Sequence, residues 1–200
     1  RRPQCLPKRV VYISSVMIET NPLSIPGAAI AKTKPHVDHR GLFGRFFCSE
    51  ELGLVFGERE IVNVNFSRTS KAGSIRGLHF QHPPKAEMKL VRCLRGAVFD
   101  VIVDLRAGSP TFLQWHGEIL SAENLRMMIL PEGVAHGFQT MENDTEMLYL
   151  HTEFFSPAHD SGIRYDDPRI GIDWPLPVAQ LSDKDTNYPL MTEDFKGLQI

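Results

Sequence analysis

The sequence predicts an all-β protein whose strands close into a barrel or jelly roll. The chain has 200 residues and is 42% hydrophobic, which is enough to bury one core without disulfide or metal support. Short runs of β-branched and aromatic residues recur roughly every ten residues, separated by Gly, Pro, Asn and Asp. So many strands leave unpaired edges unless the sheet closes, and a closed sheet also leaves room inside for a ligand.

Ten segments carry the strand pattern, and they lie at residues 28–33, 44–48, 61–67, 77–81, 88–94, 97–105, 113–120, 125–130, 136–141 and 146–154. Arg95-Gly96 between two of them predicts a tight hairpin turn. Few helices are expected, and a short one is predicted at residues 49–54, because Ser49 can cap its start. After Phe155 the chain is rich in Pro, Asp and Gly, which predicts a loop-rich C-terminal segment packed over the barrel.

One domain is expected at residues 25–200, after an N-terminal extension at residues 1–24. The formal net charge is −2 and no run of five like charges occurs, so no nucleic-acid partner is indicated. Cys5, Cys48 and Cys93 form no disulfide or zinc pattern, which favours a reducing, cytoplasmic setting. The apolar stretches are too short to cross a bilayer and no signal peptide is apparent, so we expect a soluble protein with no membrane partner.

The densest polar cluster on the apolar framework begins at Arg76, continues through His79 and Gln81, and ends near Lys89. A lone histidine inside a barrel is more often a hydrogen-bonded core residue than a site residue, but His79 lies in a segment with several other polar residues. On an ideal strand His79 and Gln81 share one face, whereas Arg76 lies on the other. Arg76 and His79 can therefore line one site only if Arg76 lies at a strand end or a bulge.

Small barrels of this kind often hold a metal on histidines, and His79, His82 and His136 are available. A strand presents two ligands on one face at positions i and i+2, whereas His79 and His82 are three residues apart and diverge. No His-x-His pair occurs in the chain. We therefore expect no metal and no other cofactor, and keep a metal-dependent oxygenase as a rival hypothesis.

Three further segments carry polar side chains that a purely structural role can explain. They are the turn and strand at residues 131–138 with His136, the alternation of Tyr149 with His151, and the charged loop at residues 181–185. Taken singly, they are typical of an incidental turn histidine, a core tyrosine whose hydroxyl reaches the rim, and a solvated loop. Function is indicated only when the segments are considered together.

Together these segments resemble the dTDP-4-dehydrorhamnose 3,5-epimerase family over about residues 25–189, nearly the whole chain. The motifs that carry the resemblance are Asp38-His39-Arg40-Gly41, Asn65-Phe66-Ser67, Arg76-Gly77-Leu78-His79-Phe80-Gln81, Lys89-Leu90-Val91-Arg92, Pro131-Glu132-Gly133, Ala135-His136-Gly137-Phe138 and Asp166-Asp167-Pro168. The resemblance implies a cupin-like jelly-roll β-barrel that forms homodimers and needs no metal. It also implies an activity in deoxysugar biosynthesis, on a nucleotide-diphosphate sugar.

The resemblance implies catalytic roles for four residues. His79 is expected to act as the general base. Asp185 is expected to orient its imidazole and to stabilise the charge that the ring gains with a proton, and Asp183 is the alternative partner. Tyr149 is expected to be the acid on the opposite face of the sugar, and Lys89 to stabilise the enolate oxygen. These residue types suit the chemistry, because a proton beside a ketone is acidic only when the site supplies both a base and a cation at the carbonyl oxygen.

A second set of residues is implied to contact the substrate, several of them at its diphosphate: Arg40, Phe43, Arg45, Asn65, Arg76, His136, Phe154 and Lys184. The chain departs from the family pattern at two of them. Arg45 stands where the family usually has an acid near the nucleotide, which raises the alternative of a base other than thymine. Phe154 stands where a tyrosine is usual, so stacking on a base is possible but a hydroxyl contact is not.

The sequence thus predicts an isomerase that epimerises C3 and C5 of a nucleotide-linked 4-keto-6-deoxyhexose by proton transfer. Alternatives are an epimerase acting at C3 only, one using another nucleotide, and a non-catalytic sugar-nucleotide binder. The presence together of His79, Lys89, Tyr149 and Asp185 disfavours the binder, because binding alone requires only arginines and stacking rings.

Overall fold

The computed structural model describes residues 16–200, which form thirteen strands and two short helices. The elements are β1 (Ile18–Pro22), β2 (Ala29–Thr33), β3 (His36–Asp38), β4 (Gly41–Phe43), α1 (Gly53–Phe56), β5 (Asn63–Thr69), β6 (Ile75–Gln81), β7 (Lys89–Arg95), β8 (Ala97–Asp104), β9 (Trp115–Ser121), β10 (Arg126–Leu130), β11 (Val134–Thr140), β12 (Thr145–His151), β13 (Asp160–Gly162) and α2 (Asp183–Thr186).

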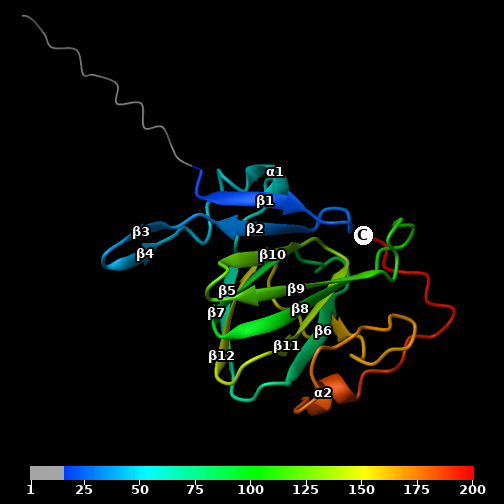
Figure 1. The fold of residues 1–200 in the computed structure, drawn as a ribbon. Helices are drawn as coiled ribbons and strands as arrows, with labels where there is room; N and C mark the ends of the chain where they lie inside the picture. The colour runs from blue at the N-terminus through cyan, green and yellow to red at the C-terminus, as the bar shows by residue number, and fades with distance from the viewer. Residues whose placement is uncertain (1–15) are drawn as a thin grey trace, which may run out of the picture.

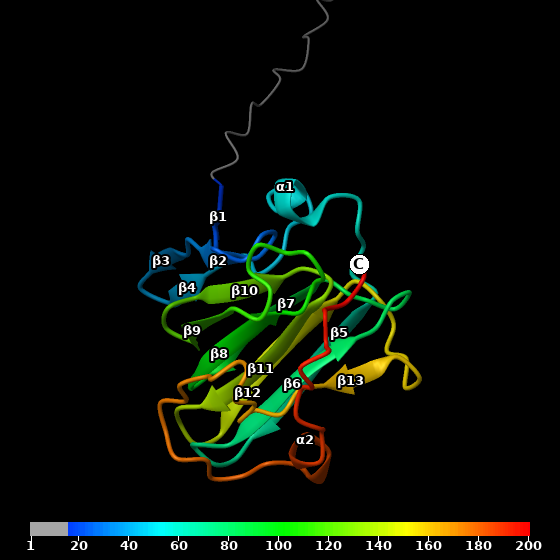
Figure 2. The same cartoon turned by 90° about the vertical axis from the view of Figure 1, so that its right-hand side faces the viewer.

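Two antiparallel sheets pack face to face, as Figures 1 and 2 show from two sides. One has six strands in the order β1-β2-β10-β7-β12-β5, and the other has five in the order β13-β6-β11-β8-β9. The β3–β4 hairpin forms a separate two-stranded sheet that projects from the body, at the left of Figure 1. This arrangement confirms the predicted all-β jelly roll with few short helices.

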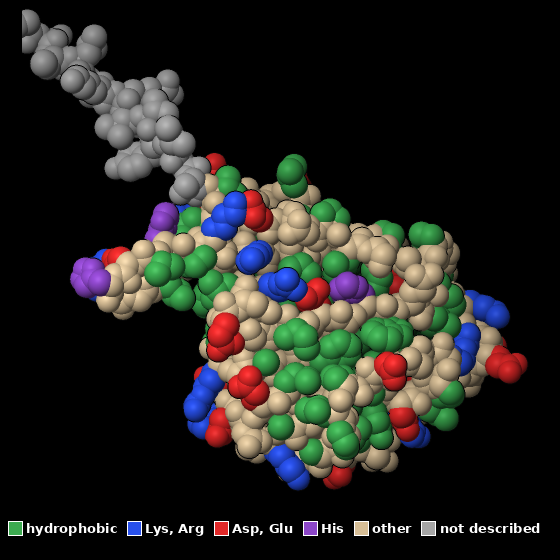
Figure 3. Space-filling view, viewed as in Figure 1, with side chains coloured by type: hydrophobic (Ala, Val, Ile, Leu, Met, Phe, Trp, Pro, Cys, Tyr) green, Lys and Arg blue, Asp and Glu red, His purple; other side chains and the backbone are tan. Residues whose placement is uncertain are grey.

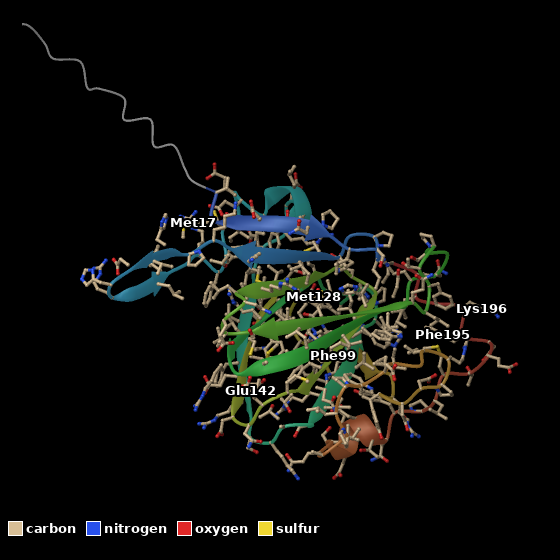
Figure 4. All side chains as sticks on the ribbon, in the orientation of Figure 1. Met17, Phe99, Met128, Glu142, Phe195 and Lys196 are labelled. Carbon is tan, nitrogen blue, oxygen red and sulfur yellow. The ribbon has the colours of Figure 1, made fainter. Side chains whose placement is uncertain are left out.

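The main core lies between the two sheets. Val91 and Met128 enter it from the six-stranded sheet, and Ile102 and Phe138 from the five-stranded sheet. The outer face of the five-stranded sheet is covered by the C-terminal segment, as predicted, and there Phe99 packs against Trp174 with ring centroids 6.2 Å apart. Figure 4 labels Met128 and Phe99, which mark these two layers, and Figure 3 shows the apolar surface over β8 and β9.

The chain between β4 and β5 differs from the prediction, because residues 44–48 form no strand. Their aromatic side chains pack onto the six-stranded sheet instead of pairing with an edge. The ring of Phe46 lies 3.5 Å from the Arg92 guanidinium carbon, and Phe47 packs edge-on against Phe56 at 5.5 Å. The helix that follows also lies later than predicted: Leu52, not Ser49, is its N-cap residue, and no side chain caps it.

The N-terminal part of the described chain belongs to the sheet. β1 lies inside the range 1–24 predicted to be an extension, yet it pairs with β2 along its whole length. Residues 1–15 of that range lie outside the described residues. Each of the two helices found in residues 16–200 has four residues, and neither could cross a bilayer.

Asp104 at the end of β8 fixes the loop that follows it. Its buried carboxylate accepts hydrogen bonds from the Arg106 guanidinium at 2.7 Å and from the hydroxyls of Ser109 and Thr111, each at 2.6 Å. Burial alone would raise the pKa of Asp104, but these donors outweigh it and lower the pKa to about 2. The ionised carboxylate therefore adds stability above the unfolded pKa of ~3.9, and this contribution is lost as pH falls toward the folded pKa.

Replacing Asp104 by Asn is expected to lower the free energy of unfolding by about 2 kcal/mol at pH 7 and by clearly less near pH 2. Urea unfolding at both pH values measures the difference. Asp144→Asn is the matched control, because Asp144 makes only a surface ion pair with Arg68 and should cost less than about 0.5 kcal/mol. An Asp104→Asn loss of the same size at both pH values would contradict the ionised-carboxylate account.

Candidate active site

A cavity of about 810 Å³ lies between the two sheets and carries most of the predicted site. Eight predicted residues line it: Asn65, Arg76, His79, Lys89, His136, Tyr149, Lys184 and Asp185. They come from strands β5, β6, β7, β11 and β12 and from the α2 segment. Residues that lie far apart in sequence thus meet in one polar cavity inside an apolar sandwich.

The strand register explains how the two walls are built. On the six-stranded sheet, Tyr149 lies directly opposite Asn65 on β5, and His151 lies opposite Lys89 on β7. On the five-stranded sheet, β6 and β11 place His79 beside His136. Since inward side chains alternate along each strand, these positions all face the space between the sheets. The imidazole of His79 and the phenol of Tyr149 therefore enter the cavity from opposite sheets.

A bulge in β6 allows both Arg76 and His79 to line the cavity. His136 and Phe138, two residues apart on β11, pair with His79 and Arg76, which are three apart on β6. The extra residue in β6 puts Arg76 and His79 on the same face of the strand, although regular alternation would put them on opposite faces. Gly77 lies inside the bulge with φ at 118°, and a Cβ atom there would lie 2.5 Å from the Cα of Gly137. Only glycine fits such a position.

His79 is held by Asp185 and not by Asp183, the alternative considered from sequence. The Asp185 Oδ1 atom lies 2.6 Å from His79 Nε2, and the Gly77 amide donates to Oδ2 at 3.3 Å. Burial would raise the pKa of Asp185, but its hydrogen bonds, first that from His79, lower it overall. The carboxylate is thus ionised and accepts the Nε2 proton, which leaves Nδ1 as the ring nitrogen that can act as a base.

Tyr149 provides a neutral phenol on the other wall. Its hydroxyl shares a hydrogen bond of 2.8 Å with the Ser67 hydroxyl from β5. Burial raises the pKa of Tyr149 to about 12, although the bond to Ser67 opposes the shift. The phenol therefore keeps its proton at neutral pH and has one to donate.

Lys89 belongs to a polar chain that sequence reasoning did not identify. Its ammonium lies 3.0 Å from Glu87 Oε1, and Glu87 Oε2 lies 2.7 Å from His151 Nδ1. Burial would raise the pKa of Glu87, but His151 and Lys89 together lower it, so the carboxylate is ionised. The alternation of Tyr149 with His151 was a signal for the histidine, whereas nothing in the sequence singled out Glu87.

His136 forms a second histidine–carboxylate pair, with its Nε2 atom 2.8 Å from Asp100 Oδ1 and both side chains buried. Burial raises the pKa of Asp100, although His136 opposes the shift. His79 and His136 are thus each bonded to a carboxylate, and His82 packs against the ring of Phe80 at 5.0 Å. Within residues 16–200 no group of three or more His, Cys, Asp and Glu side chains is placed to hold a metal ion.

Four predicted contact residues lie away from the lining of this cavity. Arg40 and Phe43 are on the projecting hairpin, where Arg40 bonds to Asp38 at 2.6 Å. Arg45 forms an ion pair with Glu51 in its own chain. Phe154 is exposed and also misses the adjoining cavity of about 210 Å³, which its neighbour Phe155 lines.

Comparison with known proteins gives a consistent result. The model of the family described as dTDP-4-dehydrorhamnose 3,5-epimerase matches residues 22–193. A dTDP-4-dehydrorhamnose 3,5-epimerase of Sinorhizobium fredii is 42% identical over 86% of this chain and 88% of its own length.

Solved structures of similar enzymes share the fold. An epimerase from Legionella pneumophila, in complex with dTDP-4-keto-L-rhamnose, superposes with a TM-score of 0.81 at 40% identity, over 86% of this chain and 91% of its own. A 3'-monoepimerase from Streptomyces bikiniensis, in complex with dTDP-quinovose, gives a TM-score of 0.78 at 35% identity, over 84% and 85%. With its jelly roll and its polar cavity, the chain belongs to the dTDP-4-dehydrorhamnose 3,5-epimerase family.

Proposed function

We propose that this enzyme epimerises C3 and C5 of a dTDP-linked 4-dehydro-6-deoxyhexose, with His79 as base and Tyr149 as acid. The observation that carries the proposal is the pairing of His79 with Asp185 on one wall of the cavity and of Tyr149 with Ser67 on the other. Two proton-transfer groups on opposite walls suit inversion of a carbon, which loses its proton on one face and regains one on the other.

Each inversion proceeds in two proton transfers. His79 takes the proton from the carbon beside the ketone, and the electron pair of the broken C–H bond moves to the ketone oxygen as an enolate. The Lys89 ammonium stabilises that negative charge. The enolate carbon then takes the phenolic proton of Tyr149 on its other face, which restores the ketone. Exchange with solvent removes the proton from His79 and returns one to Tyr149.

The nucleotide and the number of inverted carbons distinguish this proposal from its alternatives. The relatives named above act on or hold dTDP-sugars, and one of them inverts a single carbon. Arg45 gives no reason to expect a nucleotide base other than thymine, since Glu51 of the same chain neutralises the charge of its guanidinium.

Incubation with dTDP-4-dehydro-6-deoxyglucose and with its UDP counterpart, followed by NMR of the products, tests the proposal. We expect inversion at both carbons and faster turnover of the dTDP sugar. Inversion at C3 alone supports the monoepimerase alternative, and binding without conversion supports the non-catalytic one.

We also infer a homodimer in which each β3–β4 hairpin reaches the cavity of its partner. Val37, Leu42 and Phe43 on the hairpin are 74%, 59% and 69% exposed, an unusual apolar surface for a projecting segment. Val64 and Phe66 on the edge strand β5 are exposed as well. Such a dimer would bring Arg40 and Phe43 to a substrate that they cannot reach in their own chain.

Cys48 and Cys93 are free thiols, which fits the predicted cytoplasmic setting.

Mixing two inactive variants, Arg40→Glu and His79→Asn, is expected to restore activity if the hairpin acts on the partner. Random pairing places one intact cavity beside one intact hairpin in half of the dimers, so about a quarter of the wild-type activity should return. Activity is measured after the two variants are unfolded and refolded together. Activity equal to the sum of the two separate variants would show that each hairpin serves its own chain or none.

A further inference from the structure

His151 lines the cavity and Glu87 lines the smaller adjoining one, and the proposed reaction assigns neither of them a role. Glu87, in the loop before β7, is nearly buried and touches two cavity residues at once, Lys89 at 3.0 Å and His151 at 2.7 Å. His151 is the inward-facing residue next after Tyr149 on β12, and the two rings are stacked with centroids 6.3 Å apart. The pair therefore belongs to the wall of the proposed acid.

The hydrogen bonds of His151 fix which nitrogen can accept a proton. The ionised Glu87 carboxylate can only accept, so the Nδ1 atom of His151 must donate to it. The other ring nitrogen, Nε2, lies 3.3 Å from the amide nitrogen of Asn65, which can only donate. Glu87 thus holds a proton on Nδ1, and the Asn65 amide group faces a lone pair on Nε2. The contact with Asn65 is long, so a better donor can readily replace it.

The position of His151 next to Lys89 indicates what that donor is. The two residues lie directly opposite each other on β12 and β7, and Glu87 bridges their side chains. If the Lys89 ammonium binds the ketone oxygen on C4, then His151 faces a substituent of a carbon next to C4. On one side of C4 that group is the C3 hydroxyl, which can donate; on the other side, C5 carries a methyl group and the ring oxygen, which cannot.

We propose that His151 accepts a hydrogen bond from the C3 hydroxyl of the substrate, and that Glu87 is the positioning residue that sets the His151 tautomer and holds Lys89. The inference rests on the proposed function and extends it. When C3 loses its proton it becomes planar, and its hydroxyl moves into the plane of the enolate. A bond to a fixed imidazole nitrogen holds the hydroxyl in that plane, and a contact made better in the enolate than in the ketone accelerates the step.

The test compares two dTDP-linked 4-keto sugars, one with the C3 hydroxyl and one 3-deoxy analogue, in His151→Phe and wild-type enzyme. The rate of deuterium uptake at C3 from D2O is measured by NMR. We expect His151→Phe to slow uptake about tenfold for the hydroxylated sugar and less than about twofold for the 3-deoxy sugar. Equal slowing of both sugars, or of neither, overturns the proposal. If the phenylalanine variant folds poorly, the same comparison of the two sugars is made with His151→Asn, which keeps a polar side chain of smaller size.

Glu87→Gln tests the positioning role, because a glutamine has a single acceptor atom and cannot serve both Lys89 and His151. We expect kcat for the hydroxylated sugar to fall about tenfold with KM changed less than about threefold, and Glu87→Asp to recover part of the loss. Glu153→Gln is the matched control: this carboxylate pairs with Lys85 at 3.2 Å, does not line the larger cavity, makes no ion pair with Lys89 or His151, and should leave kcat unchanged.

A merely structural role for Glu87 predicts that Glu87→Gln loses thermal stability and activity toward both sugars alike. A wild-type enzyme that takes up no deuterium at C3 from either sugar would refute the proposed function itself, and this inference with it. That result differs from an active wild type whose His151→Phe variant fails to distinguish the sugars.

Discussion

Replacing His79 by Asn is expected to lower kcat for epimerisation by about 10²–10⁴-fold, the usual contribution of a positioned proton-transfer group. The Asn side chain is polar and smaller, its amide lies near the position of the imidazole Nδ1, and it carries no basic nitrogen. KM should change little, because the substrate contacts proposed for Arg76 and Lys184 remain. The measurement is steady-state turnover of the dTDP sugar, with circular dichroism to verify the fold.

Two companion variants sharpen this result. Asp185→Asn should also cost about 10²–10⁴-fold in kcat, because the amide no longer fixes the tautomer that leaves Nδ1 as the base. His159→Asn is the matched control, since His159 bonds to Ser156 at 2.8 Å and does not line the cavity. An enzyme that keeps more than about a tenth of its activity without His79 would exclude that residue as the base.

The sequence predicted the walls of the cavity well, because side-chain alternation along a strand depends only on local geometry. An ideal strand would put Arg76 and His79 on opposite faces, so both can line one cavity only if β6 is irregular. The register shift beside Gly77 is that irregularity. The resemblance to the family suggested Asp185 as the partner of His79, and the fold brings the two side chains together. No periodicity within the sequence could have joined residues 106 positions apart.

The features missed in the sequence depend on contacts between segments. Glu87 lies in a short loop without strand alternation, and its importance follows only from its two neighbours, Lys89 and His151. The segment 44–48 has strand-like composition, but its rings gain more by packing on the six-stranded sheet than by pairing. The hairpin at residues 36–43 is exposed throughout and so lacks the alternation of a half-buried strand.

Replacing Tyr149 by Phe is the second change for which we expect a large effect, about 10²–10⁴-fold on the rate of inversion. The variant lacks only the hydroxyl that Tyr149 shares with Ser67, so the ring still fills its place in the wall. His79 and Lys89 remain, and together they can still form the enolate. The carbon can then recover a proton only on the face from which it left, through His79. Proton exchange without inversion should therefore survive.

The most direct test of this two-faced mechanism is a single NMR experiment on Tyr149→Phe in D2O, which follows deuterium uptake and configuration at C3 together. We expect uptake within about tenfold of the wild-type rate, while inversion falls by about 10²-fold or more. If uptake and inversion fall by the same factor, Tyr149 does not deliver the proton to the opposite face, and the assignment of His79 and Tyr149 to the two faces of the sugar is wrong.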